Sequence, residues 1–166
     1  MSKTVYPEGG NVYERAQVDV IAGRMAEKDN PLIQVVVGPR QTGKSTMIAQ
    51  ALRKLDAPYH FASSDDAVVL SRQWLETEWQ QARNMLQSHA GQVVLVVDEI
   101  QKVPHWPTAV KSLYDSDRRN LTSMKVVLSG SSSLLLHKAR GVFGGCEASC
   151  SLLGGGVRCY VVARGQ

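Results

Sequence analysis

Short runs of mostly apolar residues alternate along this chain with segments in which apolar residues recur at helical spacing. Three of the runs, at residues 32–37, 93–97 and 124–129, are dominated by valine, leucine and isoleucine. Strands buried on both faces of a parallel sheet have this composition, whereas half-exposed strands alternate with polar residues. The run at 93–97 therefore predicts a central strand, and a weaker candidate strand covers residues 57–62.

The segments between these runs have the spacing of amphipathic helices. The longest of them places apolar residues at i, i+4, i+7 and i+11, namely Leu75, Trp79, Ala82 and Leu86. We interpret Trp74 and Trp79 as core residues rather than as a base-stacking pair, because amphipathic packing accounts for their spacing. Other helices are predicted at about residues 11–29, 47–55, 107–119 and 134–136. Strands that alternate with helices predict a doubly wound α/β sheet.

A glycine-rich turn follows the first strand and fits the phosphate-binding pattern G-x-x-x-x-G-K-[ST], the P-loop. Backbone N–H groups of such a loop curl around an anion, and Gly38 and Gly43 allow the backbone angles and close approach that this requires. Lys44 is expected to reach the β- and γ-phosphates, and the Ser45 hydroxyl to ligate Mg²⁺. The residues predicted to surround the phosphates are Gly38, Pro39, Arg40, Gln41, Thr42, Gly43, Lys44, Ser45 and Thr46.

Two acidic residues end the central strand, and a serine ends the strand that follows it. Asp98 is expected to hold Mg²⁺, directly or through water. Glu99 is placed to polarise an attacking water, as a general base or as an orienting group. Ligands of open parallel sheets bind beyond the carboxyl ends of the strands, so both groups belong at the phosphate site. Ser129 is predicted to contact the γ-phosphate or the nucleophilic water, with Ser131 as an alternative. The cofactors expected from these residues are ATP and Mg²⁺.

A family resemblance over about residues 14–140 rests on three segments taken together. They are G-P-R-Q-T-G-K-S-T, V-V-L-V-V-D-E-I-Q-K-V-P-H-W and V-V-L-S-G-S-S-S-L-L-L. The chain resembles the bacterial and archaeal AAA-type ATPases of the AAA+ superfamily, which often carry a nuclease-like C-terminal domain. The resemblance implies Walker A at residues 38–45, Walker B at Asp98 with the glutamate at Glu99, and sensor 1 near Ser129. It also implies a three-layer α/β/α P-loop fold with a mainly parallel sheet, in which the sensor strand separates the Walker B strand from the P-loop strand.

The end of the chain has a different composition. Residues 141–166 hold seven of the 14 glycines and all three cysteines, Cys146, Cys150 and Cys159. The spacing C-x3-C-x8-C without a nearby histidine does not match a zinc site, and we interpret the cysteines as incidental. The sequence of residues 157–162 is compatible with a short strand.

We therefore divide the chain into a lead-in at residues 1–11, an ATPase core at 12–140 and an atypical tail at 141–166. With the tail set apart, the expected P-loop fold is incomplete at its C-terminal end. A shifted reading frame or an early stop would produce such a change, and so would a naturally divergent tail.

Composition narrows the expected location and partners. The net charge is +4, and the lysines and arginines are scattered, which favours a solvated mixed-charge surface over a nucleic-acid-binding stripe. No apolar run approaches the roughly 20 residues of a membrane span, and the first residues lack the apolar region of a secretory signal. We expect a cytoplasmic protein with ATP as ligand, without a membrane partner, that works as a homo-oligomer or with a partner protein.

Two functions follow from these residues. The first is an ATPase that hydrolyses ATP to ADP and phosphate with Mg²⁺, and the alternative is a nucleotide-dependent interaction or signalling module without turnover. A small-molecule kinase is disfavoured because adjacent Asp98 and Glu99 suit water activation. No arginine can be assigned as an arginine finger, since Arg118 and Arg119 are candidates by position alone. Nucleotide binding with weak or no turnover is therefore expected.

Overall fold

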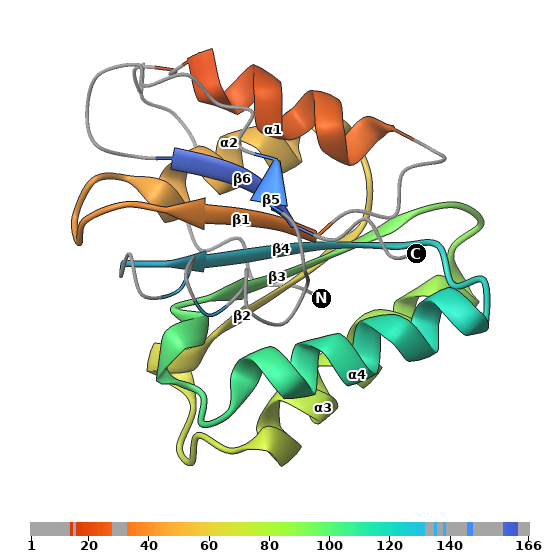
Figure 1. Cartoon of the computed structure of the whole chain (residues 1–166). Helices are drawn as coiled ribbons and strands as arrows, with labels where there is room; N and C mark the ends of the chain where they lie inside the picture. The colour runs from red at the N-terminus through yellow and green to blue at the C-terminus, as the bar shows by residue number, and fades with distance from the viewer. Residues whose placement is uncertain are drawn as a thin grey trace.

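The computed structural model describes residues 14, 16–27, 33–131, 135 and 138, together with the backbone of residues 146–147 and 158–162. Within these residues a single sheet has the order β2-β3-β4-β1-β6-β5 (Figure 1). Its strands are β1 (Ile33–Val37), β2 (Tyr59–Ser63), β3 (Val93–Asp98), β4 (Met124–Gly130), β5 (Cys146–Glu147) and β6 (Arg158–Val162). The helices are α1 (Ala16–Ala26), α2 (Lys44–Leu55), α3 (Arg72–Ser88) and α4 (Trp106–Arg119), with the short 3₁₀ helices η1 (Ser64–Asp66) and η2 (Ile100–Lys102).

The four strands β2, β3, β4 and β1 are parallel, and β4 lies between β3 and β1. The register pairs Val36 of β1 with Ser129 of β4, and Ser63 of β2 with Asp98 of β3. This is the sheet order that the family resemblance implied, so the predicted mainly parallel P-loop fold is confirmed. Strand β6 joins the other edge of β1 in antiparallel orientation, and β5 pairs antiparallel with β6.

Several element boundaries differ from the sequence prediction. Strand β2 begins at Tyr59, two residues later than expected. Pro58 has no N–H for the ladder, and its carbonyl instead accepts a hydrogen bond from Val94 N at 3.0 Å. Helix α1 ends at Ala26. The expected cap at Asn11, the expected end near residue 29 and most of the short helix at 134–136 lie outside the described residues.

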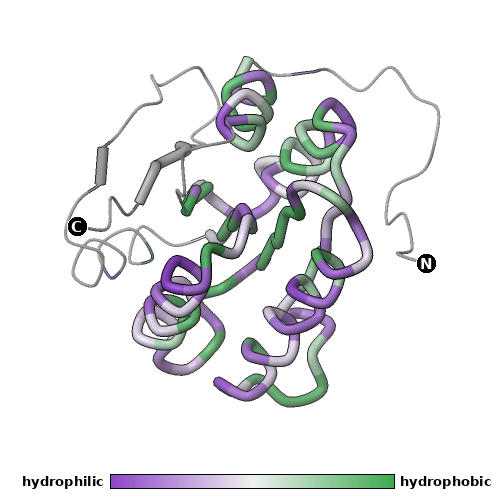
Figure 2. The backbone as a smooth tube through the Cα atoms, turned by 90° about the vertical axis from the view of Figure 1, so that its right-hand side faces the viewer, coloured by the Kyte–Doolittle hydropathy of each residue, from purple (hydrophilic) through white to green (hydrophobic). Residues whose placement is uncertain are grey.

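Each face of the sheet carries its own apolar cluster, because alternate residues of a strand point to opposite faces. Helices α1 and α2 cover one face, where the strand residues of the cluster are Val36, Val94, Val96 and Val127. Helices α3 and α4 cover the other, where the strand residues include Val35, Leu95, Val97, Val126 and Leu128. The views agree on this arrangement: Figure 1 shows the helix pairs on opposite sides of the sheet, and Figure 2 shows green, apolar strands between helices that carry both colours.

Helices α3 and α4 are joined by a buried polar contact. Trp79 is fully buried, and its indole Nε1 donates to Asp117 Oδ2 at 2.6 Å. Arg83 Nε donates to the other carboxylate oxygen of Asp117 at 2.7 Å. Trp74 is partly buried against the same core. Both tryptophans therefore have the core role that the helical spacing predicted.

None of the helices in the described part of the chain has the length and apolar character needed to cross a membrane.

We predict that Asp117→Ala lowers the free energy of unfolding by about 2–4 kcal/mol, because it leaves a buried indole N–H and a half-buried guanidinium without their acceptor. Asp115→Ala, on the same helix, is the matched control. Asp115 forms an exposed i,i+4 pair with Lys111, so its loss should cost about 0.5 kcal/mol or less. Urea unfolding followed by circular dichroism measures both. Equal losses in the two variants would contradict the prediction.

Candidate nucleotide site

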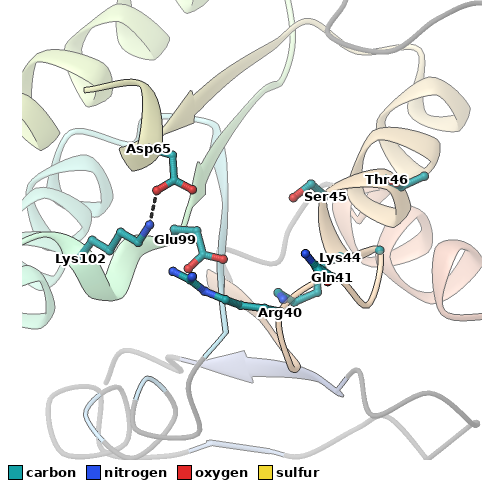
Figure 3. A pocket seen from close by; sticks show the side chains of 9 residues that line it. Arg40, Gln41, Lys44, Ser45, Thr46, Asp65, Glu99 and Lys102 are labelled. Carbon is teal, nitrogen blue, oxygen red and sulfur yellow. Dashed lines mark hydrogen bonds and ion pairs between the residues drawn. The ribbon is translucent and has the colours of Figure 1, made fainter. Parts of the chain in front are cut away.

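The candidate site lies at the edge of the sheet where the four parallel strands end. Strand β1 leads into the loop at residues 38–43, β3 ends at Asp98, β4 ends at Gly130, and β2 leads into η1. A cavity of about 520 Å³ lies beside the loop, the start of α2, η1 and the turn after β3 (Figure 3), and neither Asp98 nor a residue of β4 lines it. Its lining residues are Arg40, Gln41, Gly43, Lys44, Ser45, Thr46, Asp65, Glu99 and Lys102. The cavity thus combines most of the predicted loop residues with Glu99.

The loop backbone leaves the start of α2 open. Gly43, the residue before α2, has a φ of 80°. Because glycine has no side chain, the N-cap residue makes no side-chain hydrogen bond to the first N–H groups of the helix. Those groups and the positive end of the helix dipole are therefore available to an anion. Gln41 also has a positive φ, of 60°, whereas Gly38 does not, so the expectation that Gly38 needs a glycine-type backbone angle is wrong. Gly38 instead anchors the loop by donating its N–H to Gly130 O at 3.3 Å.

Lys44 is buried under its own loop. The residue is 5% exposed, and its Nζ donates to Gly38 O at 3.0 Å and to Pro39 O at 2.7 Å. Thr42 Oγ1 also donates to Pro39 O, at 2.8 Å. These bonds keep the amine at the cavity wall, where it is one of the lining groups. Its contact with β- and γ-phosphates stays a prediction.

The carboxylate of Asp98 gathers donors from three segments of the chain. Ser45 Oγ, in the first turn of α2, donates to Asp98 Oδ2 at 2.9 Å. Ser129 Oγ, near the end of β4, donates at 2.5 Å to Asp98 Oδ1, which also accepts the N–H of Glu99 at 3.1 Å. Ser129 is fully buried and does not line the cavity. The structure therefore brings Ser45, Asp98 and Ser129 together, while the predicted contact of Ser129 with a phosphate or water stays a prediction.

Glu99 lines the cavity from a left-handed backbone conformation, with a φ of 54°. Its Oε2 accepts hydrogen bonds from Gln101 Nε2 and, at 3.2 Å, from Ser131 Oγ. Ser64 Oγ donates to the Glu99 carbonyl at 2.8 Å. Ser131 was left open as an alternative to Ser129, but Gln101 and Ser64 were missed. Gln101 stands in one of the three segments that carry the family resemblance, yet no role was assigned to it, and Ser64 stands in none of them.

The opposite wall of the cavity holds an ion pair that sequence reasoning also missed. Lys102 Nζ of η2 donates to Asp65 Oδ1 of η1, and both residues line the cavity. Figure 3 shows this pair across the cavity from Lys44 and Ser45, with Arg40 and Glu99 between them. The available signal was the position of Lys102, three residues after Glu99. No role in the site was predicted for Asp65.

The oxygen donors Ser45 and Asp98 fit a magnesium ion. Adjacent ligands of an octahedral Mg²⁺, each about 2.0–2.1 Å from the metal, lie about 2.9 Å apart. Ser45 Oγ and Asp98 Oδ2 are 2.9 Å apart. Among the described residues no group of three or more histidine, cysteine, aspartate or glutamate side chains forms a metal site. Since Mg²⁺ usually takes one or two protein ligands together with phosphates and water, two donors suffice.

The family model of the AAA domain matches residues 30–154, or 125 of the chain's 166 residues. The chain belongs to the AAA domain family. The resemblance to AAA+ ATPases and the P-loop ATPase core are thereby confirmed, and the match bears on that core rather than on a nuclease-like domain. The match also continues past residue 140, where the sequence analysis placed the end of the core.

Similar folds occur among solved structures at low sequence identity. The Orc1 protein of Aeropyrum pernix, solved in complex with DNA, is 15% identical with a TM-score of 0.53, and the match covers 78% of this chain and 42% of that one. A RuvB mutant of Thermotoga maritima is 18% identical with a TM-score of 0.49, over 77% and 43% of the two chains.

A DNA replication initiation factor is 18% identical with a TM-score of 0.42, over 76% and 42% of the two chains. The match thus spans less than half the length of each of these three solved proteins. A search of curated protein sequences gave no significant match.

We predict opposite effects for two glycine-to-alanine changes. A Cβ at Gly130 would lie 2.1 Å from Gln101 Oε1 and 2.5 Å from Leu135 Cδ1, so Gly130→Ala should cost about 1–3 kcal/mol by overpacking. Gly23, in α1, has nothing within 4 Å of such a Cβ. Gly23→Ala should therefore stabilise the protein by about 0.5–1 kcal/mol through helix propensity. Urea midpoints measure both, and an unchanged midpoint for Gly130→Ala would show that Gln101 is free to move.

Proposed function

We propose that this AAA-domain protein binds ATP with Mg²⁺ in the cavity at the strand ends and hydrolyses it to ADP and phosphate. The observation that carries the proposal is the 2.9 Å contact between Ser45 Oγ and the Asp98 carboxylate. It joins the first turn of the P-loop helix to the tip of the central strand. Membership of the AAA domain family supports the same conclusion.

The phosphate contacts come from the loop and α2. The open N–H groups at the start of α2 bind phosphate oxygens, and Lys44 exchanges its two carbonyl acceptors for oxygens of the β- and γ-phosphates. Residues 38–45 are then the Walker A motif and Asp98 the Walker B aspartate. Ser45 and Asp98 hold Mg²⁺, which when bound neutralises charge on the phosphate oxygens.

Glu99 is the proposed general base. Water attacks the γ-phosphorus, its proton passes to the Glu99 carboxylate, and the bond from the γ-phosphorus to the ADP oxygen breaks. Glu99 lines the cavity, as this step requires. Ser129 keeps the Asp98 carboxylate aligned through its hydroxyl, which is the role we give to a sensor serine here.

Turnover by one copy of the chain should be slow. Arg40 is the one arginine among the described cavity-lining residues. Helix α4 carries the chain back from the site edge to the opposite edge of the sheet, where β4 begins, so Arg118 and Arg119 at its end lie away from the cavity. An arginine supplied by a second copy or a partner protein would complete the site.

The alternative of a nucleotide-dependent interaction module without turnover is favoured by one observation. Glu99 Oε2 already accepts two hydrogen bonds, so this oxygen is engaged by Gln101 and Ser131 before an attacking water arrives. We retain a cytoplasmic location and a homo-oligomer or partner protein as proposals. The Orc1 structure contains DNA, but the scattered charge of this chain gives no reason to propose nucleic acid as its ligand.

We predict that Lys44→Ala abolishes measurable ATP binding, whereas Glu99→Gln retains it and slows phosphate release by about 10²- to 10⁴-fold. Lys44 supplies charge to the bound phosphates, while Glu99 acts only on the attacking water. Equilibrium dialysis with labelled ATP and a phosphate-release assay separate the two steps. Wild-type rates in Glu99→Gln would remove Glu99 from its proposed role, and binding without any wild-type turnover would favour the alternative function.

We also predict that Ser45→Ala removes most of the Mg²⁺ dependence of ATP affinity, because Asp98 alone remains to hold the ion. ATP affinity measured without metal should change by less than about threefold, since the loop contacts remain. Titrations with and without Mg²⁺ give both numbers. Ser131→Ala is the matched control, as Ser131 contacts Glu99 and Gln101 rather than Asp98. An undiminished metal effect in Ser45→Ala would exclude Ser45 as a ligand.

A further inference from the structure

Besides the wall that carries Lys44, a second wall of the cavity also carries a lysine. Lys102 lines it from η2 and pairs with Asp65, which lines it from η1. The backbone that carries Lys102 is well anchored: Lys102 N donates to Glu99 O at 3.1 Å, and Ile100 in the same turn is fully buried. The long side chain of Lys102 is therefore the part of this wall that can move.

We propose that Lys102 contacts the terminal phosphate of the bound nucleotide, and that Asp65 holds the lysine at the cavity wall until the nucleotide enters. The inference rests on the proposed function of the site. Lys102 is then a nucleotide-contacting residue and Asp65 a positioning residue, which acts through Lys102 by competing with the phosphate for its charge.

The ion pair between Lys102 and Asp65 is weak enough to be exchanged. The side chains are 30% and 57% exposed, and ion pairs at such positions add little stability because water screens both charges. When Lys102 leaves, the more exposed Asp65 carboxylate is rehydrated at little cost. A triphosphate carries more charge than one carboxylate and offers several oxygens to an ammonium group, so it is the stronger partner.

The position of Lys102 indicates that it contacts the terminal phosphate rather than the phosphates held by the loop. Lys44 stands on the loop side of the cavity, where the phosphates meet the start of α2. Lys102 stands on the opposite side, one short helical turn after Glu99, which the proposed function places next to the attacking water. A group on that side approaches the phosphate that water attacks. ADP lacks that phosphate and should not draw Lys102 away from Asp65.

The test measures affinities of Lys102→Met and Asp65→Asn for a non-hydrolysable ATP analogue and for ADP, both with Mg²⁺. Lys102→Met should weaken binding of the analogue by about 10- to 100-fold, as expected for one charge-assisted hydrogen bond, and change ADP affinity by less than about threefold. Asp65→Asn should tighten binding of the analogue by about two- to fivefold, because Lys102 no longer has a competing carboxylate.

Controls separate a phosphate contact from a structural ion pair. Lys111→Met and Asp115→Asn remove the two sides of an exposed pair on α4 and should leave both affinities unchanged. Lys102→Arg keeps the charge and should retain at least about a third of the wild-type preference for the analogue over ADP. Circular dichroism of each variant establishes that it is folded.

Effects of opposite sign in Lys102→Met and Asp65→Asn support the proposal. Unchanged affinities in both variants, or weaker analogue binding in both, would overturn it. The ATP site itself would stand in that case, provided that the wild-type chain binds ATP and Lys44→Ala abolishes the binding. A wild-type chain with no affinity for either nucleotide would overturn the proposed function and this inference together.

Discussion

The carboxylate of Asp98 is the point at which three separate segments of the chain meet. A half-buried carboxylate is stable only when donors surround it, and here they are the hydroxyls of Ser45 and Ser129 and the N–H of Glu99. Each donor is placed by the sheet. Strand β4 lies between β3 and β1, so Ser129 stands between the tip of the central strand and the loop that leads to Ser45. The sheet order thus determines the geometry of the site.

The parts of this arrangement that depend on local pattern were predictable. Continuous apolar strands, the loop between a strand and a helix, and acids at a strand end each leave a signal within a few residues. Val36 and Val96 are buried because both faces of the sheet are covered, and their runs show no polar alternation. The order of the strands left no such signal. It came from the resemblance to AAA-type ATPases, because spacing along a chain does not encode which strands are neighbours.

What the sequence did not reveal are side-chain partnerships between distant segments. Lys102 and Asp65 are 37 residues apart and meet only because β2 and β3 are paired and each continues into a 3₁₀ helix. Gln101 bonds to Glu99 because η2 turns the chain back on itself. The later start of β2 has a chemical cause, the missing N–H of Pro58, whose carbonyl still accepts from Val94 N.

The two walls of the cavity are held by interactions of different strength, and this difference bears on how the site responds to a ligand. On the loop side, Lys44 is nearly enclosed and satisfied by two backbone carbonyls, and the loop is bonded to β4 through Gly38. On the other side, Asp65 and Lys102 are paired through partly exposed side chains that water can solvate.

Glu99 stands next to that second wall with a left-handed backbone, which costs about 1 kcal/mol or more and is held by Ser64 and η2. An anion that enters the cavity should therefore displace the side chains of η1 and η2 most easily. Movement of side chains should concentrate there, next to the proposed general base, while the loop and α2 hold the phosphates of the proposed ligand in place.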